Sequence, residues 1–234
     1  MPSFPNDTSA VLHWIYLGRL DFASAMKVQS DLHRRIVNDD TQPDTVIFLE
    51  HEPTISCGRH TNMNNVLFTV EQLSERGIRL EHIDRGGDVT FHGPGQLVCY
   101  PVRRVRTQVK THVDGVTRVL QELLLGYGIP TDWSDENPGL WTSQGKIAAL
   151  GMRIREGVSL HGFALNVNID LNYFSCIIPC GLKKPVDRMI DHRGNDSMSA
   201  TDFSSMSAAI AQDLVRSFGY SCCENIKRLP ADVS

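Results

Sequence analysis

The sequence has few cysteines, no long apolar run and no excess of positive charge, and each absence excludes a class of protein. Its six cysteines are scattered over 234 residues, at positions 57, 99, 176, 180, 222 and 223. This scatter is unlike the dense disulfide framework of a small secreted domain, so reduced thiols in a cytosol are expected. The longest apolar runs, such as 46–49 and 160–165, fall far short of the roughly 20 residues that a membrane helix needs.

Charge and the N-terminal segment narrow the functional classes further. The formal net charge is −4, from 23 basic and 27 acidic residues, so no global positive field attracts nucleic acid or an anionic membrane. Residues 1–8 contain no basic cluster followed by an apolar stretch, which argues against a secretory or transit peptide. We expect a cytoplasmic protein. Because no linker interrupts the chain, residues 1–234 are expected to form one domain.

Helical and strand-like patterns alternate along the chain, which predicts a single-domain α+β fold in which helices flank one mixed sheet. Apolar residues at helical spacing predict helices over 21–37, 70–76, 113–124 and 203–218. Asp21 is placed to cap the first helix, and Ser199 or Thr201 to cap the last. Gly77 ends the short second helix.

Strands are expected where β-branched and apolar residues form short runs. These runs cover residues 45–50, 78–83 and 97–102. Residues 146–167 read as a hairpin of two strands, because Glu156 and Gly157 form a tight turn between two apolar runs.

Glycines and polar side chains concentrate in residues 85–96. The run reads Arg85, Gly86, Gly87, Asp88, Val89, Thr90, Phe91, His92, Gly93, Pro94, Gly95 and Gln96. Paired glycines after a strand let the backbone approach a ligand, while Arg85, Thr90 and His92 supply donors or a proton carrier. This combination suits an acyl or phosphate group. A glycine-rich turn between strands is the ordinary alternative for a bare Gly-Gly pair.

A second concentration of reactive groups surrounds Cys180. Its neighbours Pro179 and Gly181 place the sulfur on a fixed bend. A nearby ammonium group, for which Lys146 is the candidate, would stabilise the thiolate that acts as a nucleophile. An inert buried thiol is the alternative, because sequence spacing alone does not bring Lys146 into contact with Cys180.

Several motifs follow one another in a recognisable order. They are Arg85-Gly86-Gly87, Thr90-Phe91-His92, Gly95-Gln96, Tyr100-Pro101, Lys146-Ile147-Ala148, residues 161–168, and Pro179-Cys180-Gly181. Over residues 49–182 the chain resembles the lipoyl(octanoyl) transferase family. The resemblance implies the α+β catalytic fold of lipoate and biotin protein ligases. It also implies transfer of an octanoyl group from octanoyl-acyl carrier protein to a lysine of a lipoyl domain, the first step of protein lipoylation.

The resemblance assigns roles to individual residues. It places the acyl-thioester cysteine at Cys180 and the activating lysine at Lys146. It assigns substrate binding to Arg85, Gly86, Gly87, Asp88, Val89, Thr90, Phe91, His92, Ala149, Leu150, Gly151, Gly162, Phe163 and Ala164. The implied acceptors are lipoyl domains of 2-oxoacid dehydrogenase complexes and the glycine cleavage H protein.

The implied chemistry sets requirements for cofactors and for proton transfer. Thioester exchange is nearly isoenergetic and transfer to an amine is downhill, so neither a cofactor such as ATP nor a metal is expected. The acceptor lysine, with a pKa of about 10.4, must lose a proton before it attacks. Lys146 is the preferred proton acceptor and His92 the alternative. His51, His60 and His92 form no supported metal site.

Two other functions fit parts of the pattern. An ATP-dependent lipoate or biotin ligase of the same fold would activate a free acid as an adenylate and would not need Cys180. The sequence Pro179-Cys180-Gly181 argues against it. A cysteine hydrolase would pair Cys180 with His92 or His161 and use water as the acceptor.

Two further features bear on partners. After Leu182 the chain departs from the family, whose members continue with a Gly-Val-Thr-Ser-like stretch where this chain has residues 183–189. The segment 103–110 carries four basic residues in a net acidic chain, namely Arg103, Arg104, Arg106 and Lys110. Because carrier and lipoyl domains are acidic, this segment is a candidate docking patch, and a solvated strand end is the alternative.

Overall fold

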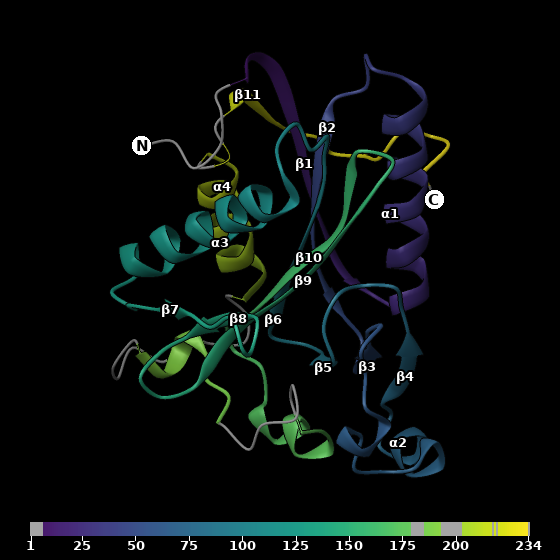
Figure 1. Cartoon of the computed structure of the whole chain (residues 1–234), viewed down its shortest axis with the longest axis vertical. Coiled ribbons are helices and arrows are strands. Elements are labelled where there is room, and N and C mark those ends of the chain that lie inside the picture. The colour runs from purple at the N-terminus through teal and green to yellow at the C-terminus, as the bar shows by residue number, and fades with distance from the viewer. Residues whose placement is uncertain (1–6, 179–184, 193–202, 217, 219, 234) are drawn as a thin grey trace.

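The computed structural model describes residues 7–178, 185–192, 203–216, 218 and 220–233, and its centre is an eight-stranded mixed sheet (Figure 1). The strand order is β11-β1-β2-β6-β10-β9-β8-β7. The strands are β1 Asp7–Leu20, β2 Asp44–His51, β6 Gln96–Val102, β7 Asp132–Trp133, β8 Gly139–Trp141, β9 Lys146–Arg155, β10 Val158–Asn166 and β11 Tyr220–Asn225. β1 runs parallel to β11 and β2, and the other neighbouring pairs are antiparallel. The predicted mixed sheet is confirmed.

A second, three-stranded sheet has the order β4-β3-β5 and lies below the main sheet in Figure 1. It consists of β3 Thr54–Cys57, β4 Arg79–His82 and β5 Val89–His92, and the short helix α2 Val70–Glu75 packs against it. β3 follows β2 after two residues, and β5 is followed closely by β6. These two short connections hold the small sheet at one end of the large one.

Helices cover both faces of the main sheet (Figure 1). Helix α1, Phe22–Asn38, packs on one face, while α3, Val109–Gly126, and α4, Phe203–Arg216, pack on the other. Along β2, Val46 and Phe48 face α3, whereas Ile47 and Leu49 face α1. Because successive side chains of a strand alternate, a strand buried on both faces is apolar throughout, as β2 is.

The predicted helix over 21–37 is confirmed as α1, and its cap is the expected one. The Asp21 side chain accepts a hydrogen bond from the Ser24 N–H at 3.1 Å, which satisfies a backbone donor of the first turn. Gln29 is a polar residue on the buried face. Its Oε1 accepts a hydrogen bond from the His161 N–H at 2.9 Å, so α1 is tied directly to β10.

The hairpin over 146–167 is also confirmed, as β9 and β10. Its turn residues Glu156 and Gly157 have φ values of 51° and 74°, as a two-residue hairpin turn requires. The sequence patterns missed β1, β3, β5, β7, β8 and β11. The glycine-rich residues 85–96, where no strand was predicted, contain the strand β5. The expected caps Ser199 and Thr201 lie outside the described residues.

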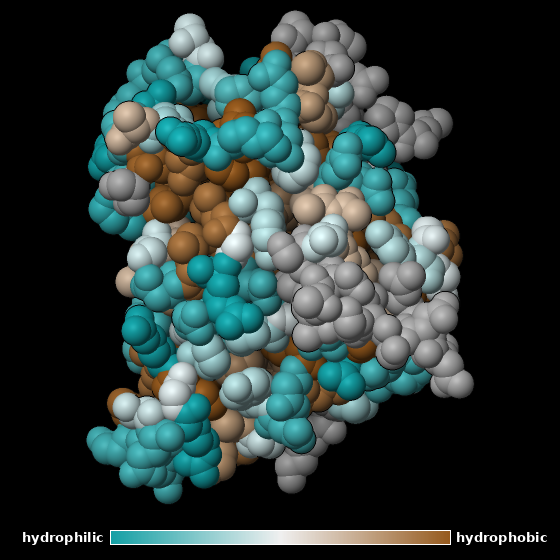
Figure 2. Space-filling view, turned by 180° about the vertical axis from the view of Figure 1, so that it is seen from behind, coloured by the Kyte–Doolittle hydropathy of each residue, from teal (hydrophilic) through white to brown (hydrophobic). Residues whose placement is uncertain are grey.

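The surface is largely hydrophilic on the face that Figure 2 shows, with hydrophobic residues gathered in a recess in the upper part of the view. Within the described ranges, no helix combines the length and the apolar character needed to cross a membrane. The cysteines of those ranges, Cys57, Cys99, Cys176, Cys222 and Cys223, all carry free thiols.

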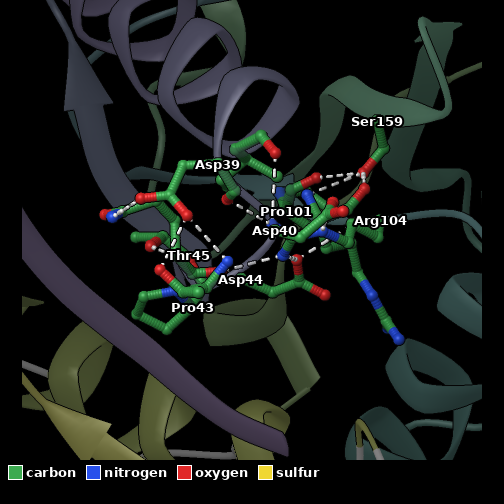
Figure 3. Close-up of polar contacts among 12 residues, drawn as sticks. Asp39, Asp40, Pro43, Asp44, Thr45, Pro101, Arg104 and Ser159 are labelled. Carbon is green, nitrogen blue, oxygen red and sulfur yellow. Dashed lines mark hydrogen bonds and ion pairs between the residues drawn. The ribbon is translucent and has the colours of Figure 1, made fainter.

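The candidate basic docking patch is smaller than its residue count suggests, because two of its four basic residues serve the fold. Arg104 donates hydrogen bonds to the carbonyls of Ile36, Asp39 and Gln42 and lies 3.0 Å from the Asp44 carboxylate (Figure 3). It thereby satisfies carbonyls at the C-terminal end of α1.

Arg103 is 8% exposed, and its guanidinium lies 4.9 Å from the centre of the Tyr220 ring. Only Arg106 and Lys110 of the four basic residues are exposed. Arg106 lies between β6 and α3 and Lys110 in the first turn of α3, so docking by this segment would rest on these two side chains.

We expect Arg104→Ala to destabilise the protein by about 2–4 kcal/mol, because three half-buried carbonyls and the Asp44 carboxylate lose the guanidinium together. Urea or thermal unfolding measures this loss. The control Arg106→Ala removes an exposed arginine and is expected to change the stability by about 0.5 kcal/mol or less. Equal effects of the two substitutions would contradict the structural role of Arg104.

Candidate active site

A cavity of about 370 Å³ lies where the small sheet meets the α1 side of the main sheet. β6, β10 and β9 provide one wall. Their register pairs Gln96 with Asn166 and Val98 with Ala164 across β6 and β10. The next pair across β10 and β9 is Ala164 with Ala149. Paired residues point to the same face of a sheet, so this row of small and apolar side chains lines the cavity.

Glycines keep this wall open next to the row of small side chains. Gly162 pairs with Gly151 across β10 and β9, and both line the cavity. A Cβ atom on Gly162 would collide with the carbonyl oxygen of Cys99 and with the Pro101 ring. Glycine is therefore required at position 162 by the close approach of β6, and the strand carries no side chain there to fill the cavity.

Most of the sequence-predicted substrate residues line this cavity. These are Arg85, Gly87, Asp88, Val89, Thr90, His92, Ala149, Leu150, Gly151, Gly162, Phe163 and Ala164, and Lys146 lines it as well. Two predicted residues do not. Phe91 points to the opposite face of β5, where its ring stacks on Tyr173 with the ring centres 4.8 Å apart. The Gly86 carbonyl accepts a hydrogen bond from Arg85 Nη1 at 2.9 Å. Pro179, Cys180 and Gly181 lie outside the described residues.

The Arg85 side chain is buried and fixed against β3. Its Nη2 donates to the carbonyl of Ser56 at 2.7 Å and to the Ser56 hydroxyl at 3.0 Å. Nε donates to the same hydroxyl at 3.3 Å. This arrangement holds the guanidinium, a permanent positive charge, in the wall of the cavity.

His92 is held as a neutral imidazole with both ring nitrogens occupied. Gln96 Nε2 donates to the Phe91 carbonyl and to Asn166 Oδ1, at 3.1 and 2.9 Å. Gln96 therefore presents its oxygen to His92 Nδ1 at 2.8 Å, and this nitrogen must carry the proton. His92 Nε2 then accepts from the Ser56 hydroxyl at 3.1 Å. Burial, with help from His51 and Arg85, lowers the pKa of His92 well below its usual range.

Two other histidines near the cavity are also kept neutral. His51 Nε2 lies 2.7 Å from the Tyr100 hydroxyl, and burial lowers the pKa of His51 to about 4. His161 Nε2 lies 3.0 Å from Asp84, and burial with the charges of Arg85 and Arg153 lowers the pKa of His161 to about 4. His161 also has a φ of 57°, an uncommon backbone conformation for a residue with a side chain.

Lys146 begins β9 and is only 7% exposed. Its ammonium lies 5.5 Å from the centre of the Trp141 ring. The Lys146 N–H donates to the Pro185 carbonyl, and the Lys146 carbonyl accepts from the Asp187 N–H, each at 3.0 Å. Residues 185–187 thus run alongside Lys146, and Val186 between them lines the cavity.

The chain before the undescribed segment 179–184 is attached to a different element. The Ile178 N–H donates to the Asn65 carbonyl at 2.8 Å, and Ile177 bridges to Val66. Phe174, a few residues earlier, lines the cavity. The described residues that precede and follow Cys180 in the sequence therefore both lie close to walls of the cavity.

Several lining residues were missed by the sequence reasoning. Val98 and Tyr100 follow Gln96 at every second position of β6, so strand alternation from the glutamine of the motif would have found them. His60, Asp135, Glu136 and Pro138 come from connections between strands and carried no signal. The described residues contain no group of three or more His, Cys, Asp or Glu side chains placed to hold a metal ion.

Comparison with known proteins supplies the family. The lipoyl protein ligase A/B catalytic domain matches residues 21–212. An octanoyltransferase from Alkaliphilus metalliredigens is 42% identical over 175 residues, which cover 73% of this chain and 80% of the relative. An octanoyltransferase from Dictyoglomus thermophilum is 41% identical over 202 residues, which cover 86% and 85%.

A solved structure extends the comparison to the fold. It comes from an archaeal lipoylation system of Thermoplasma acidophilum, described as a bipartite lipoate protein ligase and its E2 lipoyl domain. The TM-score is 0.70 at 15% identity, with 93% of this chain and 88% of that chain covered. The structural likeness confirms the predicted lipoate ligase fold. The two relatives confirm the family that the sequence motifs indicated. The chain belongs to the octanoyltransferase family, whose members share the catalytic domain of lipoyl protein ligases A and B.

Proposed function

We propose that this protein transfers an octanoyl group from octanoyl-acyl carrier protein to a lysine of lipoyl domains, as the first step of protein lipoylation. The observation that carries the proposal is the cavity, which combines a wall of small and apolar residues with the buried Lys146. An acyl chain gains about 0.8 kcal/mol for each methylene that it buries against such a wall. The acceptors are lipoyl domains of 2-oxoacid dehydrogenase complexes and the glycine cleavage H protein.

The proposed first step forms a thioester on Cys180. The Cys180 thiolate, stabilised by the Lys146 ammonium, attacks the carbonyl carbon of the donor thioester. The bond to the carrier sulfur breaks, and the departing thiolate takes a proton from Lys146. The step exchanges one thioester for another, so it requires no ATP, metal or other cofactor.

The proposed second step forms the amide. Lys146, now a neutral amine, takes a proton from the acceptor ammonium, and the resulting amine attacks the Cys180 thioester. The Cys180 thiolate leaves, the second amine proton passes to solvent, and Lys146 is again an ammonium. The neutral state of His92 supports this choice of Lys146, because both ring nitrogens of His92 are already hydrogen bonded.

The extent and location of the enzyme belong to the same proposal. We place the catalytic domain over residues 1–234 as a single unit, in the cytoplasm, where thiols stay reduced. The family match over residues 21–212 supports most of that range.

We expect the purified protein, incubated with octanoyl-carrier and a lipoyl domain, to give the octanoyl-domain product without ATP. Cys180→Ser is expected to abolish this product and the octanoyl adduct of the enzyme, because an alkoxide is far harder to form than a thiolate. Intact-protein mass spectrometry reads both species. The exposed Cys222 serves as the control, since Cys222→Ser is expected to retain product and adduct.

The same assay separates the alternatives. Free octanoate as the product indicates a cysteine hydrolase, and a requirement for ATP with free octanoic acid indicates a ligase. Either outcome, or an active Cys180→Ser variant, contradicts the proposed transfer.

Lys146→Ala is expected to slow octanoyl transfer by about 100-fold or more, because one group supplies both the positive charge and the proton transfer. The alkylation of Cys180 by iodoacetamide is expected to need a higher pH in this variant, since the thiolate loses its cation. The control Lys110→Ala removes an exposed lysine. An unchanged alkylation profile in Lys146→Ala would refute the pairing of Lys146 with Cys180.

Ala149→Leu is expected to shift the acyl preference from octanoyl towards shorter chains. Ala149 lies in the wall of small side chains, so a leucine there takes space from the end of the acyl group. If the octanoyl chain can no longer bury two of its methylenes, its binding weakens by about 1.6 kcal/mol. The ratio of kcat/KM for the octanoyl donor to kcat/KM for a butanoyl donor is then expected to fall roughly tenfold. Parallel rates with the two donors measure the ratio, and an unchanged ratio would place the acyl chain elsewhere.

A further inference from the structure

A chain of buried side chains crosses the floor of the cavity and ends on the backbone of Lys146. It runs from Arg85 through Ser56, His92 and Gln96 to Asn166, and these side chains are 0–8% exposed. Asn166 is the last residue of β10. Its Nδ2 donates to the Asp187 carbonyl at 3.0 Å and to the Lys146 carbonyl at 3.4 Å.

The direction of every hydrogen bond in this chain is fixed. Arg85 has only donors, so the Ser56 oxygen accepts from it and the Ser56 hydroxyl donates onward. At the other end, Gln96 donates to Asn166 Oδ1 at 2.9 Å. If the Asn166 amide were turned over, its nitrogen would face the Gln96 nitrogen and its oxygen would face two carbonyls. The network therefore holds the Asn166 amide in one orientation, with its N–H groups aimed at Lys146 and Asp187.

We propose that Asn166 is a positioning residue that holds the Lys146 backbone against residues 185–187, the segment that follows Cys180 in the sequence. Two backbone hydrogen bonds, which together form a parallel bridge between Lys146 and Val186, define this junction. The Lys146 N–H donates to the Pro185 carbonyl, and the Lys146 carbonyl accepts from the Asp187 N–H. The Asn166 side chain donates to one carbonyl on each side of the junction, those of Lys146 and Asp187. None of the sequence-derived substrate residues performs this task.

The consequence concerns catalysis, and it rests on the proposed role of Lys146 as the proton carrier. Lys146 must place its ammonium group accurately, since a shift of about 1 Å in a reacting group can cost roughly 100-fold in rate. Asn166 lines the cavity at its Lys146 end, and its amide is hydrogen bonded to Gln96, Lys146 and Asp187. Its removal should therefore lower kcat more than it changes KM.

Two substitutions test the role. Asn166→Ala removes the amide without adding charge. Asn166→Asp keeps the shape and the acceptor for Gln96, but its carboxylate cannot donate to the carbonyls of Lys146 and Asp187. For both variants we expect kcat to fall by about tenfold or more, with KM for octanoyl-carrier within about twofold of wild type.

The pH profile separates positioning from general damage. A protonated carboxyl regains one donor, so the kcat of Asn166→Asp relative to Asn166→Ala is expected to rise as the pH falls from about 8.5 to about 5.5. The ionisable groups that contact this network or line the cavity beside it include Lys146 on β9, His92 on β5, Arg85 before β5, Tyr100 on β6, His161 on β10, and Asp187 with His192 after residue 184. They remain the same in both variants, so their titration cancels in the ratio.

Circular dichroism and thermal unfolding establish that the variants are folded. Asn172→Asp makes the same chemical change at an exposed position and is expected to leave kcat and KM at wild-type values. If only one of the two Asn166 variants folds, the kcat and KM of that variant decide whether Asn166 has the positioning role.

The outcomes distinguish this role from the proposed function. A wild-type protein that transfers no octanoyl group overturns the proposed function. An active wild type whose folded Asn166 variants keep kcat, or lose it only through KM, overturns the positioning role and leaves the transferase proposal standing. A ratio of the kcat values of Asn166→Asp and Asn166→Ala that stays constant over the pH range also overturns the positioning role.

Discussion

The structure depends on one constraint, which is that a sheet covered on both faces has to leave space on one face for a ligand. α3 and α4 fill one face with large apolar side chains. On the α1 face, the paired rows of β6, β10 and β9 carry alanine and glycine where they meet the small sheet. The close approach of β6 makes glycine obligatory at position 162, because a Cβ atom there would strike the Cys99 carbonyl. The cavity is thus a product of strand register and residue size.

A cavity made from strand faces must also satisfy the polar groups that it buries, since each unpaired one costs about 1–3 kcal/mol. Four buried side chains are satisfied by one chain of hydrogen bonds, which runs from Ser56 through His92 and Gln96 to Asn166. Because Arg85 only donates, the whole series has one direction. The network therefore fixes a protonation state as well as a geometry, and it leaves His92 a neutral spacer between β3 and β6.

The sequence predicted helix α1 and the β9–β10 hairpin but missed β1, the longest strand, with 14 residues. α1 was predicted to the residue at its start, because an apolar stripe and the Asp21 cap agree. The β9–β10 hairpin was predicted from its turn. The strands β3, β5, β7 and β8 span two to four residues each, too few for a period to show. Phe91 was misjudged for a related reason. Thr90 and His92 line the cavity, whereas the Phe91 side chain between them points to the other face of β5 and stacks on Tyr173.

Charge was the least reliable guide, because a count of basic residues carries no information about burial. Arg104 serves helix carbonyls and Arg103 lies over aromatic rings, so neither contributes to an exposed field. The same reasoning applies to the buried histidines, of which His92 and His161 suggested acid–base chemistry in the sequence. Burial lowers the pKa values of His51 and His161 to about 4, and that of His92 well below its usual range, so all three stay neutral near pH 7. The neutral state of His92, with both ring nitrogens hydrogen bonded, favours Lys146 over His92 in the proposed proton transfer.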